Sequence, residues 1–135
     1  MNSEAAWFKF YGSIPHSLDY PDISMCEMVF RSEKEHPDFT AYDFMGNSST
    51  YKKLKEDIEA AARALIALGV KKGDAVTICL PNMPQAVILF YAVNRVGAVA
   101  NMVHPLSAEN EILFYLKLSR SRFALTLTDF YKKFE

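Results

Sequence analysis

The sequence predicts an α/β fold, in which a partial three-layer α/β/α unit follows an N-terminal arm, a helix and a short antiparallel hairpin. The main observation is the stretch over residues 50–103, where two helical patterns are each followed by a short apolar run. These runs are continuous rather than alternating, which is typical of strands covered on both faces in a parallel sheet. Strands separated by helices imply right-handed βαβ crossovers and therefore helices on both faces.

The chain divides into two predicted regions. Residues 1–22 are rich in aromatic residues and turn formers, and are too few to form a core of their own. We interpret them as an extended arm whose aromatic side chains dock on the body that follows. Residues 23–135 form that body, which holds all the regular elements of the prediction.

A helix and a hairpin open the body. Ser24 and Glu27 have the spacing of a capping box, and Pro37 ends the helix shortly after its last turn. Two short runs over residues 40–44 and 48–51 flank a Gly-Asn pair, which is a hairpin signal.

The long helix predicted over residues 51–68 has clear boundaries. Thr50 is a good N-cap residue, and Gly69 suits the left-handed position that ends many helices. An apolar stripe recurs at helical spacing along it. Its members are Tyr51, Leu54, Ile58, Ala61, Leu65 and Leu68.

The remaining elements alternate between strand and helix. The predicted strands over residues 98–103 and 75–80 consist mainly of apolar residues, so both are expected to be buried. Ser107 is the expected cap of the last helix. In chain order, the elements are a strand over 75–80, a helix over 84–96, a strand over 98–103, a helix ending near 118 and a strand over 123–127.

Composition excludes several classes of protein. The 135 residues carry a formal net charge of −1 with the charges interspersed, so no nucleic-acid partner is predicted. The most apolar run, over residues 86–93, is far shorter than the roughly 20 residues of a transmembrane helix, and the first residues do not form a secretory signal. Cys26 and Cys79 are isolated, which favours buried thiols in a reduced, cytoplasmic protein.

Residues that could carry chemistry are few. The run over residues 46–52 resembles a phosphate-binding loop, yet it holds a single glycine and is better explained as a returning strand and a helix cap. No catalytic triad and no metal-ligand spacing can be recognised. We therefore predict no catalytic, cofactor-binding or metal-binding residue in this chain.

Two residues remain as weak candidates for substrate binding. Asn82 and His104 each follow a predicted buried strand. In open α/β sheets ligands bind outside the carboxyl ends of the strands. Turn chemistry explains both residues equally directly, and we favour that interpretation over ligand contact.

Short motifs in a fixed order resemble the N-terminal portion of adenylate-forming (AMP-binding) enzymes, most closely the fatty-acyl-CoA synthetases. The arm contributes Trp7, Tyr11, Pro15 and Tyr20-Pro21, which resemble the leading segment of those synthetases. The body contributes Thr50-Tyr51, Leu54, residues 64–70, Lys72-Gly73-Asp74, Leu80-Pro81-Asn82, residues 92–99, His104-Pro105-Leu106, Glu111 and Leu116.

The resemblance implies a two-step reaction in the complete enzyme. A carboxylic acid attacks ATP, accompanied by magnesium, to give an acyl-adenylate, and coenzyme A then displaces AMP. The family's phosphate loop and its C-terminal domain have no matching positions in residues 1–135, so no catalytic residue is carried over. The expectation is a truncated N-terminal subdomain that is inactive alone, whose partner is the missing C-terminal remainder and whose exposed core surface would allow self-association.

The substrate expected from the arm is a fatty or similar carboxylic acid. Two alternatives stay open. The chain could belong to another adenylate-forming enzyme, either an amino-acid adenylation domain or an aryl-acid ligase. It could also be a stand-alone, non-catalytic α/β binding module.

Overall fold

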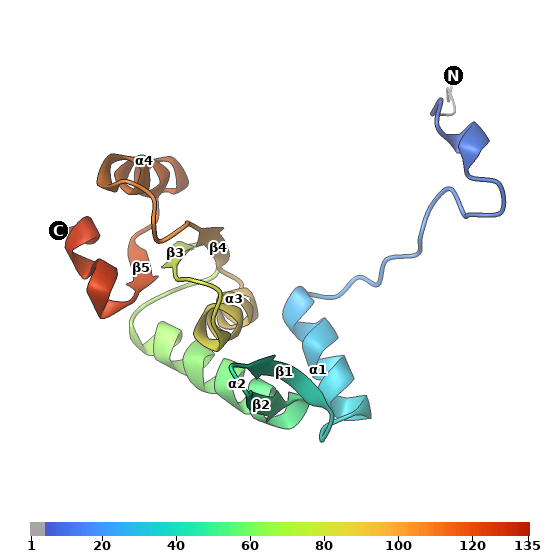
Figure 1. Cartoon of the computed structure of the whole chain (residues 1–135), viewed down its shortest axis with the longest axis horizontal. Coiled ribbons are helices and arrows are strands. Elements are labelled where there is room, and N and C mark those ends of the chain that lie inside the picture. The colour runs from blue at the N-terminus through green and yellow to red at the C-terminus, as the bar shows by residue number, and fades with distance from the viewer. Residues whose placement is uncertain (1–4) are drawn as a thin grey trace.

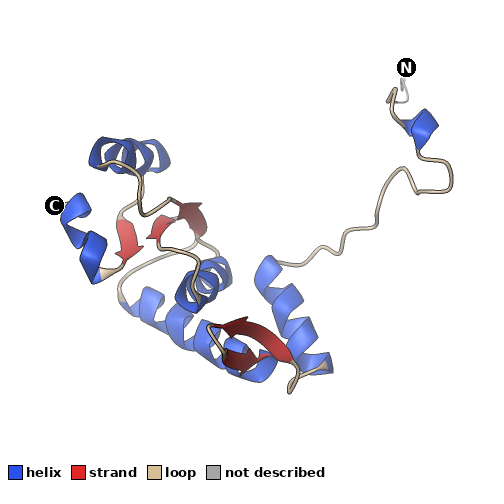
Figure 2. Ribbon diagram, in the orientation of Figure 1, coloured by secondary structure: helices blue, strands red, loops and turns tan. Residues whose placement is uncertain are grey.

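The computed structural model describes residues 5–135 and confirms an α/β fold with a separate N-terminal arm (Figure 1). Figure 2 shows the alternation of helices and strands in the body. The elements in chain order are the 3-10 helix η1 (Phe8–Phe10), α1 (Met25–Glu35), β1 (Thr40–Phe44), β2 (Asn47–Thr50), α2 (Tyr51–Ala67), β3 (Ala75–Cys79), α3 (Pro84–Val96), β4 (Val99–Met102), α4 (Glu109–Ser119), β5 (Phe123–Thr126) and the 3-10 helix η2 (Thr128–Phe134).

The body is built around a parallel sheet of three strands in the order β4–β3–β5. Side chains of the central strand alternate between its two faces. Val76 and Ile78 pack against α2 and α3, whereas Cys79 packs with residues of α4 and η2. In Figure 1 the sheet accordingly lies between α4 on one side and α3 with α2 on the other, which confirms the partial three-layer arrangement.

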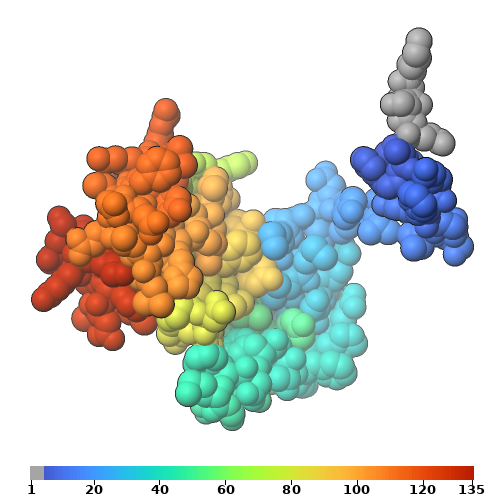
Figure 3. All heavy atoms as spheres, turned by 45° about the horizontal axis from the view of Figure 1, so that its top comes forward, coloured from blue at the N-terminus to red at the C-terminus, as the bar shows by residue number. Residues whose placement is uncertain are grey.

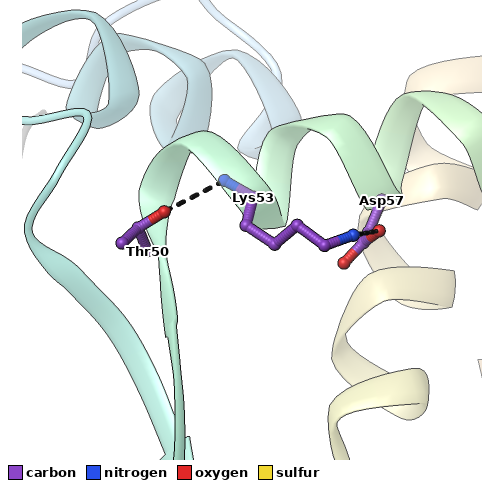
Figure 4. Close-up of polar contacts among 3 residues, drawn as sticks. All are labelled: Thr50, Lys53 and Asp57. Atoms are coloured by element: carbon purple, nitrogen blue, oxygen red, sulfur yellow. Dashed lines mark hydrogen bonds and ion pairs between the residues drawn. The ribbon is translucent and has the colours of Figure 1, made fainter.

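The boundaries predicted for α2 are confirmed, and its cap is visible in Figure 4. The Thr50 hydroxyl accepts a hydrogen bond from the backbone N–H of Lys53 at 3.2 Å, and Lys53 forms an ion pair with Asp57 one turn further on. Gly69 has a φ of +92°, as its predicted position after the helix requires. The capping box of α1 is also present, with Ser24 and Glu27 each accepting from the other's backbone N–H.

The apolar stripe of α2 differs from the prediction at four positions. Its buried members are Leu54, Ile58, Ala62 and Leu65. Tyr51 and Ala61 are only partly buried, and Leu68 is 66% exposed at the C-cap of the helix. The buried stripe therefore includes Ala62, which the prediction omitted, and it is shorter at both ends than the periodicity indicates.

Two further predictions are wrong, the first of them in part. The strand over residues 98–103 is only partly buried: Ala98 and Val103 are buried, whereas Val99 is 58% and Met102 is 52% exposed, because β4 lies at an edge of the sheet. Ser107 does not cap the last helix, since the N-cap of α4 is Ala108. There the Glu111 carboxylate accepts the Ala108 backbone N–H at 3.0 Å, which is the half of a capping box that does not need a cap hydroxyl.

The aromatic arm does not dock on the body. Figures 1 and 3 show it extending away from α1, with η1 at its outer end. Its rings pack on one another instead: Phe8 stacks on His16 with centroids 4.1 Å apart, and Tyr11 meets the Phe8 ring edge-on. Trp7 and Phe10 remain exposed. The first four residues of the predicted arm lie outside the described residues, and a boundary at residue 22 stays a prediction.

Candidate functional site

Two hollows that could hold a ligand lie at the carboxyl edge of the parallel sheet. One, of about 480 Å³, opens between the hairpin and α3. A second, of about 420 Å³, opens between the loops that follow β3 and β4 and the start of η2. Asn82 and Met102 line both hollows, so the two adjoin along this edge.

The hollow beside the hairpin is lined mainly by apolar side chains. They come from β1, from the loop after β3, from α3 and from the end of β4, and include Phe44, Met83, Val87, Phe90, Tyr91 and Met102. Asp43 is the one carboxylate among the lining residues. Its two oxygens accept from the Gly46 backbone N–H at 3.2 Å and from the Ser48 hydroxyl at 2.6 Å, so it serves the hairpin turn.

The second hollow brings together the two residues that the sequence singled out. Asn82 and His104 both line it and both are exposed. The His104 ring accepts the Leu106 backbone N–H through Nδ1 at 3.2 Å. The neutral ring therefore carries its proton on Nε2, which leaves a donor for another group. The turn interpretation of His104 is correct in part, since the ring does organise the loop.

The sequence did not single out Lys133, which bonds to the loop after β4 next to the second hollow. Its ammonium donates to the carbonyl oxygens of Pro105 and Ser107, both at 2.9 Å, and so ties η2 to the loop after β4. No local signal distinguishes Lys133 from its neighbour Lys132, because its partners lie more than 25 residues earlier in the chain.

A layer of polar side chains on the α4 side of the sheet was also missed. Thr77 is fully buried, and its hydroxyl accepts from the Asn101 amide at 2.8 Å and donates to the Ser121 hydroxyl at 2.9 Å. The same amide reaches the Ser119 hydroxyl at 3.1 Å, and Ser119 lies 2.8 Å from Ser121. Every member has a partner, so this layer joins the end of α4 to the sheet rather than awaiting a ligand.

The polar groups of the loop that resembles a phosphate-binding loop are already engaged. Ser48 donates to Asp43, and Thr50 caps α2. Its interpretation as a returning strand and a helix cap therefore agrees with the hydrogen bonds.

Neither cysteine is arranged as a nucleophile. Cys26 and Cys79 are both buried and free. Burial raises the pKa of each thiol, and the nearby Arg95 and Lys133 respectively offset that rise only in part. Both thiols are therefore protonated near neutral pH and inert, as their buried positions suggested.

Within residues 5–135, no three His, Cys, Asp or Glu side chains converge to hold a metal ion. The described residues therefore offer no metal centre built from protein ligands alone. The helices of the described part are also too short or too polar for any of them to cross a membrane.

The fold defines the class of protein. It matches the N-terminal subdomain of NpsA from Klebsiella oxytoca, solved in complex with 3-hydroxybenzoyl-AMSN, with a TM-score of 0.74 and 27% identity. That match covers 76% of this chain and 26% of the other. The class is the N-terminal part of adenylate-forming enzymes.

The chain belongs to the AMP-binding enzyme family, because the sequence pattern of that family matches residues 29–135. A long-chain-fatty-acid–CoA ligase of Bacillus subtilis is 33% identical over 128 residues, which covers 94% of this chain and 23% of the relative. An acetyl-coenzyme A synthetase of Streptomyces avermitilis is 33% identical over 106 residues, covering 75% of this chain and 16% of the relative. The chain thus spans less than a quarter of the length of these two relatives, and the resemblance seen in its motifs is confirmed.

Proposed function

We propose that this chain is the N-terminal part of an ATP-dependent acid–CoA ligase whose complete form activates a fatty acid. The observation that carries the proposal is the extent of the match to the Bacillus subtilis ligase. The match covers 94% of this chain, so the part of the chain that it omits is shorter than the 22-residue arm. Part of the arm therefore lies within the match. The match to the acetyl-coenzyme A synthetase covers a smaller share of the chain.

The experiment is an ATP–pyrophosphate exchange assay on the complete protein with magnesium and a panel of acids. We expect exchange with medium- and long-chain fatty acids, followed by thioester formation when coenzyme A is added. The competing substrate classes are aryl acids and amino acids, and the aryl class draws support from the NpsA complex. Exchange with benzoates or amino acids at rates above those for fatty acids would replace the fatty-acid assignment.

The 135-residue chain is expected to be inactive on its own. Within residues 5–135 no three metal-binding side chains converge, and the edge hollows are lined mainly by apolar side chains, with Asp43, Asn82 and His104 among the polar ones. The purified chain should therefore give no acid-dependent exchange of pyrophosphate into ATP. Robust exchange by a homogeneous sample would contradict this part of the proposal.

The structural role that we propose is packing against the rest of the enzyme. Leu113, Phe114 and Leu118 of α4 are each at least half exposed and lie on the helix that covers one face of the sheet. Exposed apolar side chains gathered on one element mark a contact surface. The isolated chain should self-associate and bind a hydrophobic dye, and Leu118→Lys should reduce both. A monodisperse monomer that binds no dye would argue against the role.

The alternative of a stand-alone binding module makes a different prediction. It requires stoichiometric binding of nucleotide or coenzyme A by the isolated chain. Calorimetric titration of the chain with ATP, AMP and coenzyme A decides between the two, because the ligase proposal predicts no saturable binding of any of them.

A further inference from the structure

The outer part of the arm, residues 5–16, is a small packed unit that we call the arm head. Its turns are held by backbone hydrogen bonds, among them one from the Tyr11 N–H to the Phe8 carbonyl at 3.0 Å and one from the Ile14 N–H to the Tyr11 carbonyl at 2.9 Å. The rings of Phe8, Tyr11 and His16 all meet one another, with centroids 4.1 to 5.7 Å apart. These three rings therefore form the inside of the arm head.

A second set of large apolar side chains stays on the outside of the arm head. Trp7, Phe10 and Ile14 are 60%, 78% and 63% exposed. Large apolar side chains that gather in water on one small unit mark an interaction site. We propose that this outer face binds the surface of a lipid bilayer, with the three side chains inserted at the boundary between the head groups and the acyl chains.

The chemistry of the arm head favours a lipid surface. Residues 5–18 contain no Asp or Glu, although the whole chain has 16 of them. Lys9 supplies the positive charge of this stretch, and its ammonium lies over the Phe10 ring, 5.0 Å from the centroid, so the charge is beside the outer face. Aromatic rings are enriched at membrane interfaces, and a lysine next to them is attracted to anionic head groups.

The connection to the body leaves the outer face of the arm head accessible to a flat surface. Residues 17–22 form no helix or strand and are all exposed, and Figures 1 and 3 show the arm head away from α1. A second copy of the chain would present the same body, on which the arm head does not dock here. Because η1 is only three residues long, the arm head is expected to lie on a bilayer and not to cross it.

The test uses Trp7, which is the only tryptophan of the chain, so that its fluorescence reports on the arm head alone. The purified 135-residue chain is titrated with vesicles of equal parts phosphatidylcholine and phosphatidylglycerol. We expect the emission to shift to shorter wavelength as the indole leaves water, and vesicles with brominated acyl chains to quench it. Emission that stays that of an exposed indole at every lipid concentration would overturn the proposal. A shift that grows with protein concentration without vesicles would also overturn it, and would make a second copy the occupant.

Three variants identify the contact. Phe10→Ser removes one of the exposed rings and should weaken partitioning into the vesicles by about tenfold. Leu118→Ser is the matched control, because Leu118 is 70% exposed but lies on α4, and this variant should leave partitioning unchanged. Lys9→Gln should weaken binding to the mixed vesicles by about fivefold and leave binding to pure phosphatidylcholine unchanged. Circular dichroism of each variant verifies that the body is folded.

Two further outcomes would overturn the proposal. Equal losses in Phe10→Ser and Leu118→Ser would show that vesicles bind any apolar surface of the chain. A Trp7 shift that neither Phe10→Ser nor Ile14→Ser changes would show that the outer face is not the contact.

The proposal goes beyond the proposed function and does not rest on it. Co-sedimentation of the complete protein with the same vesicles tests the arm head without any acid substrate, whereas pyrophosphate exchange tests the ligase without lipid. Absence of co-sedimentation would therefore refute the membrane contact alone, and absence of exchange would refute the ligase assignment alone.

Discussion

Thr77 of the central strand allows a sharp test of how the sheet is held to α4. Thr77→Val replaces the buried hydroxyl by a methyl group of similar size. The change removes two hydrogen bonds, one from the Asn101 amide and one to the Ser121 hydroxyl. Neither partner is left without a bond, because Asn101 still reaches Ser119 and Ser121 still lies 2.8 Å from Ser119.

The magnitude follows from that remaining connectivity. Two neutral hydrogen bonds contribute about 1 kcal/mol each, and a partner left fully unsatisfied would add about 1–3 kcal/mol more. The cost of an unsatisfied partner is absent here, because both partners keep another bond. Burying a methyl group in place of a hydroxyl also offsets part of the lost hydrogen-bond energy. We therefore expect Thr77→Val to lower the free energy of unfolding by about 1–2 kcal/mol.

The assay is urea unfolding followed by far-UV circular dichroism, with the m value compared between variants. Ile78→Val is the matched control, since Ile78 is the next residue on the same strand and faces α2 and α3 instead. It removes one methylene and should cost about 0.5–1.5 kcal/mol. A double-mutant cycle with Ser121→Ala should then give a coupling energy of about 0.5–1 kcal/mol with Thr77→Val and none with Ile78→Val. A neutral or stabilising Thr77→Val, or a cycle without coupling, would refute the reasoning.

Three smaller predictions follow from local contacts. Thr50→Ala removes the cap of α2 and should cost about 1 kcal/mol in the same urea assay, whereas Thr50→Ser should cost less. The Glu27 carboxylate accepts the Ser24 backbone N–H, and its hydrogen bonding with Ser24 lowers its pKa below the usual value. The stability that Glu27 contributes is therefore present above the usual pKa and is lost as the pH falls through the lowered pKa. On acidification, the melting temperature of the unsubstituted chain should therefore drop more than that of Glu27→Gln. Cys79 should resist a thiol reagent until urea unfolds the chain, and rapid labelling of the folded chain would contradict its burial.

The accuracy of the sequence predictions depends on how local their signals are. The range of α3 was predicted correctly because Pro84 suits the first turn and Gly97 takes a φ of +78° at the end. The exposure of β4 could not be predicted, because it depends on the strand order and not on the apolar composition of the strand itself. The polar layer is equally non-local, since Thr77 and Ser121 are 44 residues apart.

The candidate site shows the same division. Asn82 and His104 were placed at one edge correctly, because the carboxyl ends of neighbouring parallel strands meet there. The hollow between the hairpin and α3 was missed, because it depends on where the hairpin lies relative to α3. Strand and helix patterns carry no information on that placement.

The hairpin packs on a core cluster that does not itself line the hollow between the hairpin and α3. Cys26, Leu54 and Ile58 form this cluster, and Tyr42 and Tyr91, which line the hollow, pack against it. A further bond, from the Cys26 backbone N–H to the Asn94 side chain at 2.9 Å, joins α1 to α3. The cluster therefore couples the stability of the body to the shape of this hollow.

Ile58→Ala tests this coupling. The substitution should lower the free energy of unfolding by about 2–5 kcal/mol and leave a cavity beneath Tyr42 and Tyr91. Leu65→Ala is the matched control, because Leu65 is similarly buried on the same helix but packs in the cluster against β3. If the cluster positions the tyrosines that line the hollow, Ile58→Ala changes the near-UV circular dichroism of the chain under conditions in which both variants remain folded, while Leu65→Ala does not. Equal changes in the two variants would show that the hollow responds only to general loss of stability, and the cluster would then have no specific role in shaping it.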